Sequence, residues 1–242
     1  MREYLRLTRT HTYSLLFALP LLLLYEVGAW LIADQSRGMR NGADVLLRTL
    51  LAAGGVGGTL AFTAVLVCAA VVLIGIEQRR RRVRVRIPLL AAMLTESVVY
   101  ALVFGVVVGT LTRWLLGGVR LAADGSQLTA MPRGDQVVLS LGAGIYEELL
   151  FRVLLVGGLL AVLTAAGLRR NSASWAAAIL AALIFSAFHY IGPYAYPLEL
   201  QSFTFRFIAG LAFSGLFLLR GFGIAAWTHA LYDVFLVMIG AG

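Results

Sequence analysis

Long apolar stretches with few interruptions restrict the fold of this chain more than any other feature of its sequence. Each of seven stretches approaches the roughly 20 residues that an α-helix needs to cross about 30 Å of hydrocarbon. Backbone groups find no water in lipid, so the stretches predict helices, which bond their backbone within one segment. The expected fold is an all-α, polytopic membrane bundle of about seven transmembrane helices. The expected spans are Ser14–Ala33, Val56–Ile76, Pro88–Leu111, Val137–Ala166, Ser174–Ile191, Phe203–Leu219 and Phe222–Gly240.

One further apolar segment, Ala43–Gly55, is shorter than a span and ends in glycines. It is expected to lie at the membrane interface or to enter and leave the membrane on one side, so the expected number of spans is six to eight.

The first span follows three arginines, as a signal peptide would. Its apolar run is long, however, carries Glu26 and lacks a small-residue cleavage site after it, so we expect a retained helix.

The composition fits a membrane protein and argues against a nucleic-acid partner. Hydrophobic residues make up 60% of the 242 residues and charged residues 13%, against about 25% in soluble domains. All 20 basic residues are arginines, set against 12 acids, and the net charge is +8. Apart from Arg152, these arginines are assigned to the segments between the apolar stretches, so they are interpreted as topology markers. Cys68 is the single cysteine, so no disulfide can form within the chain.

The distribution of arginine predicts how the helices are oriented. With seven spans, twelve arginines fall on the side of the N-terminus and seven on the opposite side. Because positive loops stay in the cytoplasm, the N-terminus is expected there, in a membrane that the compact, arginine-rich chain suggests is a bacterial plasma membrane. The N-terminal side carries Arg2, Arg6, Arg9, Arg79, Arg80, Arg81, Arg82, Arg84, Arg86, Arg169, Arg170 and Arg220. The opposite side carries Arg37, Arg40, Arg48, Arg113, Arg120, Arg133 and Arg206.

Ionisable side chains inside the expected spans are the strongest indication of a function. A charge at membrane depth costs at least about 2.5–3.5 kcal/mol on insertion scales, so each needs a reason to be there. Glu26 and Glu96 have no partner that the sequence identifies, and either could line a cavity with the others. The residues of this kind are Glu26, Glu96, Glu147, Glu148, Arg152, His189, His229 and Asp233.

Two adjacent glutamates of the fourth span differ in whether their own helix offers them a cationic partner. On an α-helix, Glu148 and Arg152 are four residues apart and lie about 40° from each other around the axis, which favours an ion pair. Glu147 points roughly 100° away from Glu148 and has no cation on its own helix. A buried carboxylate without a cation can take and return protons. The alternative is that both glutamates serve helix packing, and this explains Glu148 better than Glu147.

Two more spans place histidines at comparable depth. His189 follows Phe185 by one helical turn, and His229 and Asp233 are four apart and face the same direction. Each motif alone is also explained by a hydrogen-bonded core residue or a local packing pair. Together with Glu147, however, three helices need polar partners away from lipid, and convergence satisfies them at once. A carboxylate and two imidazoles suffice to activate water and to bind an oxyanion.

Three motifs therefore follow one another on successive apolar helices. They read Glu147-Glu148-Leu-Leu-Phe-Arg152, Phe185-Ser-Ala-Phe-His189 and His229-Ala-Leu-Tyr-Asp233. This order resembles the CAAX prenyl endopeptidase and bacteriocin-processing family of intramembrane proteases, also called the Abi family. Its pattern is Glu-Glu-x-x-x-Arg, then Phe-x-x-x-His, then His-x-x-x-Asn or Asp. We accordingly expect N-terminal transmembrane helices over 1–136 and a catalytic core of four helices over 137–242.

The resemblance implies a role for each motif residue. Glu147 and His189 would activate water, and His229 and Asp233 would stabilise the oxyanion. Glu148 and Arg152 would support the site. Many relatives carry asparagine at the last position, whose amide can donate to an oxyanion, whereas an ionised aspartate cannot. The aspartate is therefore expected to be protonated, to orient the neighbouring histidine, or to bind something else.

No obligatory metal or other cofactor is expected. The family has been described both as metalloproteases and as metal-independent glutamate proteases. Glu147, His189 and His229 are the residues that could hold zinc with an open position. The chain lacks a His-Glu-x-x-His helix, which would have been a strong indication of zinc.

The expected function is that of an intramembrane endopeptidase that cleaves a membrane-associated peptide or protein. That substrate and the lipid bilayer are the expected partners, and nucleic acid is not. Two alternatives stay open: a catalytically idle protein that binds a partner, as in immunity or scaffolding, and a proton-coupled transporter. The complete motif set disfavours the first, and the absence of an internal repeat disfavours the second.

Overall fold

A computed structural model describes residues 2–33, 38–116, 131–192, 195 and 197–240, and within these ranges the chain is helical and has no strand. The elements in chain order are α1 (Arg2–Thr8), α2 (His11–Leu31), α3 (Gly42–Ala53), α4 (Thr59–Arg81), α5 (Ile87–Leu115), α6 (Arg133–Gly142), η1 (Ala143–Glu147), η2 (Leu149–Val156), α7 (Gly157–Ala165), α8 (Arg170–Phe188), α9 (Leu200–Arg220) and α10 (Phe222–Met238).

Six helices of the described chain are long and apolar enough to cross a membrane. The seventh expected span is α10, which is apolar but only 17 residues long. Each expected span therefore has a helix, and the all-α polytopic bundle is confirmed. The six long helices are His11–Leu31, Ala61–Arg81, Ile87–Leu115, Arg133–Ala165, Arg170–Phe188 and Leu200–Arg220. The short segment expected at the interface forms α3.

Large apolar side chains cover the outer surface of the bundle. Val71 on α4 is 62% exposed, and Val106 and Trp114 on α5 are 69% and 77% exposed. In water such a surface would be unfavourable, whereas hydrocarbon around the bundle would cover it.

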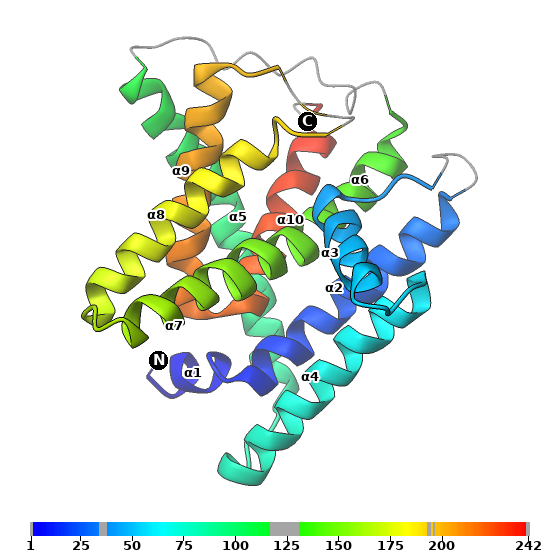
Figure 1. Ribbon diagram of the computed structural model, residues 1–242, viewed down its shortest axis with the longest axis vertical. Helices are drawn as coiled ribbons and strands as arrows, with labels where there is room; N and C mark the ends of the chain where they lie inside the picture. Colours follow the sequence, from blue (N-terminus) through cyan, green and yellow to red (C-terminus); the bar gives the residue numbers. More distant parts are fainter. Residues whose placement is uncertain (1, 34–37, 117–130, 193–194, 196, 241–242) are drawn as a thin grey trace.

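The last helix lies in the middle of the bundle (Figure 1). α10 packs against α2, α5, α6, α9 and the η1 segment. The turn that leads into it is a single residue, Gly221, whose φ of 88° is open to glycine without strain. Because α10 touches helices from both halves of the chain, it brings His229 and Asp233 next to residues from distant segments.

Some arginines that were assigned to loops between the spans lie elsewhere in the structure. Arg206 was counted with the loops, but it lies inside α9, so that assignment is wrong. Arg40 and Arg48, also counted as topology markers, form ion pairs inside the bundle. Arg37 and Arg120 lie outside the described residues.

Candidate active site

The fourth span is not a regular α-helix. Between α6 and α7 it contains the two π-helical segments η1 and η2. A π turn is closed by hydrogen bonds between residues five apart, so the angles expected for an α-helix do not apply here. Segments of this kind occur frequently at functional sites. The two segments and the residue between them carry Glu147, Glu148 and Arg152.

A glycine allows η1 and α10 to approach closely. A Cβ atom on Gly144 would lie 2.5 Å from the Cβ of Ala230 and 2.6 Å from the carbonyl oxygen of Ala226. No larger residue fits without a shift of backbone, which is the usual reason for small residues where membrane helices cross. The contact brings His229 to Glu148.

Glu147 is 7% exposed and has two partners, neither of them on its own helix. Its Oε1 accepts a hydrogen bond of 2.9 Å from Nδ2 of Asn41, the residue before α3. Its Oε2 lies 3.9 Å from Nε2 of His189. That separation exceeds a hydrogen bond, so the second oxygen faces the imidazole without bonding to it directly.

The other nitrogen of His189 fixes the orientation of its ring. Nδ1 lies 2.9 Å from the carbonyl oxygen of Phe185, one turn earlier. A carbonyl only accepts, so Nδ1 carries the hydrogen and donates it. In the neutral ring, Nε2 is then the acceptor, and it is this atom that faces Glu147.

Glu148 is fully buried and contacts two other motif residues. Its Oε1 accepts a hydrogen bond of 2.8 Å from Nδ1 of His229. Its Oε2 lies 3.2 Å from Nε of Arg152, so the ion pair expected from the spacing is present. The second imidazole is thereby oriented by a carboxylate, as the first is by a carbonyl.

Arg152 is buried between aromatic rings. Its guanidinium carbon lies 4.5 Å from the ring centre of Phe185 and 5.4 Å from that of Phe213. Both rings also contact His229, Phe213 stacking on it at 4.5 Å. The two terminal nitrogens of Arg152 make no hydrogen bond with the described residues, so its charge is balanced mainly by Glu148.

Asp233 stands at the edge of this group. Its Oδ2 lies 3.5 Å from Nε2 of His229, and its side chain is 28% exposed, the highest value among the paired motif residues. All six expected site residues thus lie in one contiguous cluster. We call it the motif cluster: Glu147, Glu148, Arg152, His189, His229 and Asp233.

Among the described residues, no three histidine, cysteine, aspartate or glutamate side chains come together in a way that could hold a metal ion. The zinc alternative through Glu147, His189 and His229 stays a prediction, and no step below is assigned to a metal.

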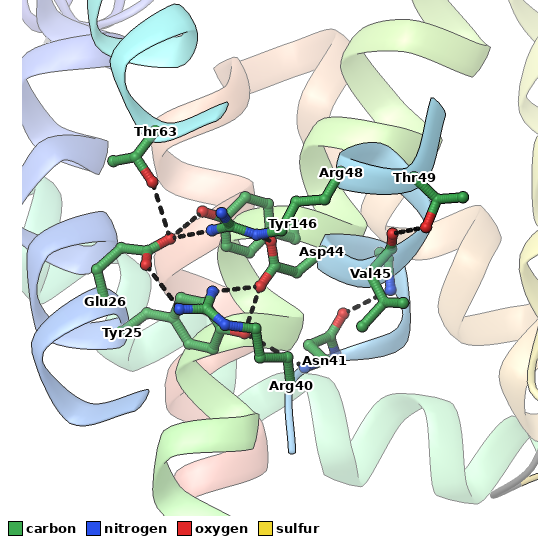
Figure 2. Close-up of polar contacts among 11 residues, drawn as sticks. Tyr25, Glu26, Arg40, Asn41, Asp44, Val45, Arg48, Thr49, Thr63 and Tyr146 are labelled. Carbon is green, nitrogen blue, oxygen red and sulfur yellow. Dashed lines mark hydrogen bonds and ion pairs between the residues drawn. The ribbon is translucent and has the colours of Figure 1, made fainter. Parts of the chain in front are cut away.

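Glu26, one of the two acids that could have lined a cavity with the motif residues, lies in a second cluster. Its carboxylate forms ion pairs with Arg40 at 3.0 Å and with Arg48 at 2.7 Å, and it accepts from the hydroxyl of Tyr146 at 2.6 Å. Asp44, on α3, pairs with the same two arginines. Figure 2 shows both guanidinium groups lying between the two carboxylates. We call Glu26, Arg40, Asp44 and Arg48 the α3 cluster.

The charges of the α3 cluster balance. Burial lowers the pKa of Arg40, which lies in the loop before α3, but its hydrogen bonds with Glu26 and Asp44 raise that pKa above the ordinary value. Arg40 therefore stays cationic, and two cations face two anions.

Glu96 is also held away from the motif cluster. It pairs with Arg220 at 2.6 Å and accepts from the hydroxyl of Tyr4 at 2.5 Å. These contacts tie α5 to the end of α9 and to α1. Like Glu26, Glu96 has a structural partner that the sequence did not identify.

The residue that the sequence analysis missed is Asn41. Its place before an apolar segment is that of an ordinary helix cap, and its side chain does accept from the backbone N–H of Ala43. Nothing in that local signal indicates the second contact, which reaches Glu147 across 106 positions of sequence.

Comparison with known proteins agrees with the motif order. Residues 131–235 match the model of a family described as type II CAAX prenyl endopeptidase, Rce1-like. The matched range contains all six residues of the motif cluster. No curated protein and no solved structure gives a significant match. The six apolar helices and the matched family together indicate an integral membrane protein.

Proposed function

Because residues 131–235 match the model of the Rce1-like family of type II CAAX prenyl endopeptidases, we propose that this chain hydrolyses a peptide bond in a membrane-associated peptide or protein. The reaction would use water held between Glu147 and His189. The observation that supports this best is the position of Oε2 of Glu147, which faces Nε2 of His189 at 3.9 Å. One water between them can donate a hydrogen to each.

The first step follows from that arrangement. Both hydrogens of the water point toward the protein, so a lone pair of its oxygen is left for the substrate carbonyl. As the oxygen attacks the carbonyl carbon, Glu147 takes a proton from the water, and negative charge develops on the carbonyl oxygen. When the carbon–nitrogen bond breaks, Glu147 gives the proton to the leaving nitrogen. The products are a carboxylic acid and an amine.

His229 is proposed to stabilise the oxyanion. Its Nδ1 donates to Glu148, which fixes the ring, and in the imidazolium form Nε2 donates as well. A donor held in place before the reaction stabilises the developing charge more than a mobile one. Asp233, 3.5 Å from Nε2, is proposed to orient the ring and to balance its charge.

Glu148 and Arg152 are proposed to support this arrangement rather than to react. Glu148 bonds to His229 and pairs with Arg152, so a proton taken by Glu148 would remove the negative charge that strengthens both contacts. Removal of either partner would leave a buried charge unpaired.

Neither alternative function is supported by the placement of the remaining acids. A proton relay needs carboxylates that can give up their protons, whereas Glu26 and Glu96 are each held by arginine. An idle binding protein would not need a carboxylate oxygen of Glu147 and a ring nitrogen of His189 that face each other at 3.9 Å.

We also propose an orientation and a location for the chain. The N-terminus lies in the cytoplasm, because of the arginine count, and the membrane is a bacterial plasma membrane. A prenylated C-terminal peptide is a candidate substrate only through the name of the matched family.

The test is a cleavage assay of the purified protein in detergent. Wild type and Glu147→Gln are incubated with a pool of peptides that includes a farnesylated peptide and its unmodified twin, with and without a chelator, and products are identified by mass spectrometry. We expect cleavage by the wild type alone, unaffected by the chelator. Equal cleavage by both proteins would contradict the role of Glu147, and loss of cleavage with the chelator would contradict a metal-independent mechanism.

A further inference from the structure

Asn41 joins the α3 cluster to the motif cluster. Its side-chain Oδ1 accepts from the N–H of Ala43 at 2.9 Å, and its Nδ2 donates to Oε1 of Glu147 at 2.9 Å. Rotating the amide by 180° would set a carbonyl against a carboxylate and an NH₂ against an N–H. The hydrogen-bond partners of Oδ1 and Nδ2 therefore both require the same orientation of the amide.

The backbone of Asn41 is held as firmly as its side chain. Its N–H donates to the hydroxyl of Tyr25 at 3.3 Å, and that hydroxyl donates to Asp44 at 2.8 Å. Asp44 is in turn fixed by Arg40 and Arg48 (Figure 2). The ion pairs of the α3 cluster thus fix the residue that contacts Glu147.

Packing leaves Asn41 little room to move. A Cβ atom added to Gly142, in the last turn of α6, would lie 3.0 Å from the Cβ of Asn41 and closer still to the ring of Tyr25. The backbone of α6 therefore lies directly against Asn41, one turn before Glu147.

The chemical nature of this partner sets Glu147 apart from the two acids of the α3 cluster and from Glu96. Glu26, Asp44 and Glu96 are each held by arginine, which neutralises them. An amide donates a hydrogen bond without adding a charge, so it can orient a carboxylate that still takes up a proton.

We propose that Asn41 is a positioning residue for Glu147, which binds Oε1 so that Oε2 faces His189, and that the α3 cluster exists to hold it there. The inference rests on the proposed function in that it assumes Glu147 is the base. The contact itself does not depend on any reaction.

Two substitutions separate this role from the capping of α3. Serine and aspartate are both good N-caps, so Asn41→Ser and Asn41→Asp keep the bond to Ala43. Serine lacks a group long enough to reach Glu147, and aspartate sets a second carboxylate against it. Thr49→Ala is the matched control, because Thr49 is an exposed residue of the same helix whose hydroxyl, among the described residues, donates to the carbonyl of Val45 and to no group of the motif cluster.

The cleavage assay should separate these variants. For Asn41→Ser we expect kcat to fall about 10-fold with little change in KM, as for loss of one hydrogen bond to a charged group. For Asn41→Asp we expect the acidic limb of the pH–rate profile to move up by about one unit, because two adjacent carboxylates cannot both ionise easily. Thr49→Ala should behave as wild type.

A role confined to structure would give a different result. Asn41→Asp would then keep the wild-type pH profile, and any loss of activity would follow the loss of folded protein in thermal unfolding. That outcome, or wild-type kcat in Asn41→Ser, would overturn the proposal.

A second readout does not require cleavage. The apparent melting temperatures of wild type, Asn41→Ser, Glu147→Gln and the double variant form a double-mutant cycle. Non-additive shifts are expected if Asn41 holds Glu147, and additive shifts would overturn the proposal. If the wild type cleaves nothing, the proposed function fails, while this cycle still decides whether Asn41 positions the carboxylate.

Discussion

The α3 cluster and the motif cluster both contain carboxylates inside the bundle, but the partners of these carboxylates differ. Glu26 and Asp44 face two guanidinium groups, from Arg40 and Arg48, through four ion-pair contacts. Glu147 faces a neutral amide on one side and an imidazole on the other. Burial does not distinguish them, since Asp44 is 0% exposed and Glu147 only 7%.

The difference shows what makes a buried carboxylate reactive. A carboxylate bonded to arginine gains an attraction that protonation would remove, so it stays ionised and serves the structure. A carboxylate that is oriented by a neutral donor keeps its orientation whether it is ionised or protonated. The type of partner, rather than depth, identifies Glu147 as the candidate base.

Removing His189 should have the largest effect on cleavage. In His189→Gln the ring nitrogen that would accept from the water is lost, and loss of a general base or its partner lowers rates by about 10²–10⁴-fold. The measurement is the rate at saturating substrate, with folded protein checked by thermal unfolding. A decrease in substrate affinity alone would assign His189 to binding.

Removing His229 should have a somewhat smaller effect. In His229→Gln the proposed oxyanion donor is replaced by an amide that cannot carry a positive charge. Loss of one oxyanion donor lowers kcat by about 10²–10³-fold. If KM rises while kcat is unchanged, the residue binds substrate and does not stabilise the transition state.

A change in the α3 cluster should act first on stability. Asp44→Asn leaves Arg40 and Arg48 with Glu26 as their remaining acidic partner in the cluster, and breaking a buried ion pair costs about 3–5 kcal/mol. Thermal unfolding in detergent measures the change. We expect a clear decrease in melting temperature, and a smaller loss of cleavage per folded molecule than in His189→Gln. An unchanged melting temperature would contradict a structural role for the cluster.

The smallest effect is expected at Asp233. Asp233→Asn should change cleavage less than about 10-fold, because an amide carbonyl can still accept from His229 and the amide NH₂ can donate to an oxyanion. The ratio of kcat values for the two proteins at one pH measures it. A loss comparable to that of His229→Gln would show that the negative charge of Asp233 is required.

Much of the fold was predictable because hydropathy is a property of single segments. The apolar stretches gave the spans, and local spacing gave the Glu148–Arg152 pair, which depends on residues four apart. The convergence of Glu147, His189 and His229 was also correctly expected, because polar groups in lipid have few other ways to find partners.

The partners of the remaining acids were not predictable for a physical reason. Glu96 meets Arg220 across 124 positions, and Glu147 meets Asn41 across 106. No periodicity links such residues, so only the packed bundle shows that they touch. The π-helical turns were missed as well, since the helical wheel assumes 3.6 residues per turn throughout.

The most direct test of the account compares the same chemical change at two glutamates. Glu147→Gln and Glu199→Gln each replace one carboxylate by an amide, the first in the motif cluster and the second at an exposed position before α9. The quantity to measure is the cleavage rate per folded molecule on a substrate that the wild type cleaves. We predict wild-type cleavage for Glu199→Gln and a loss of at least about 10³-fold for Glu147→Gln, with no loss of thermal stability. Substantial cleavage by folded Glu147→Gln would contradict the central claim that this carboxylate activates the water.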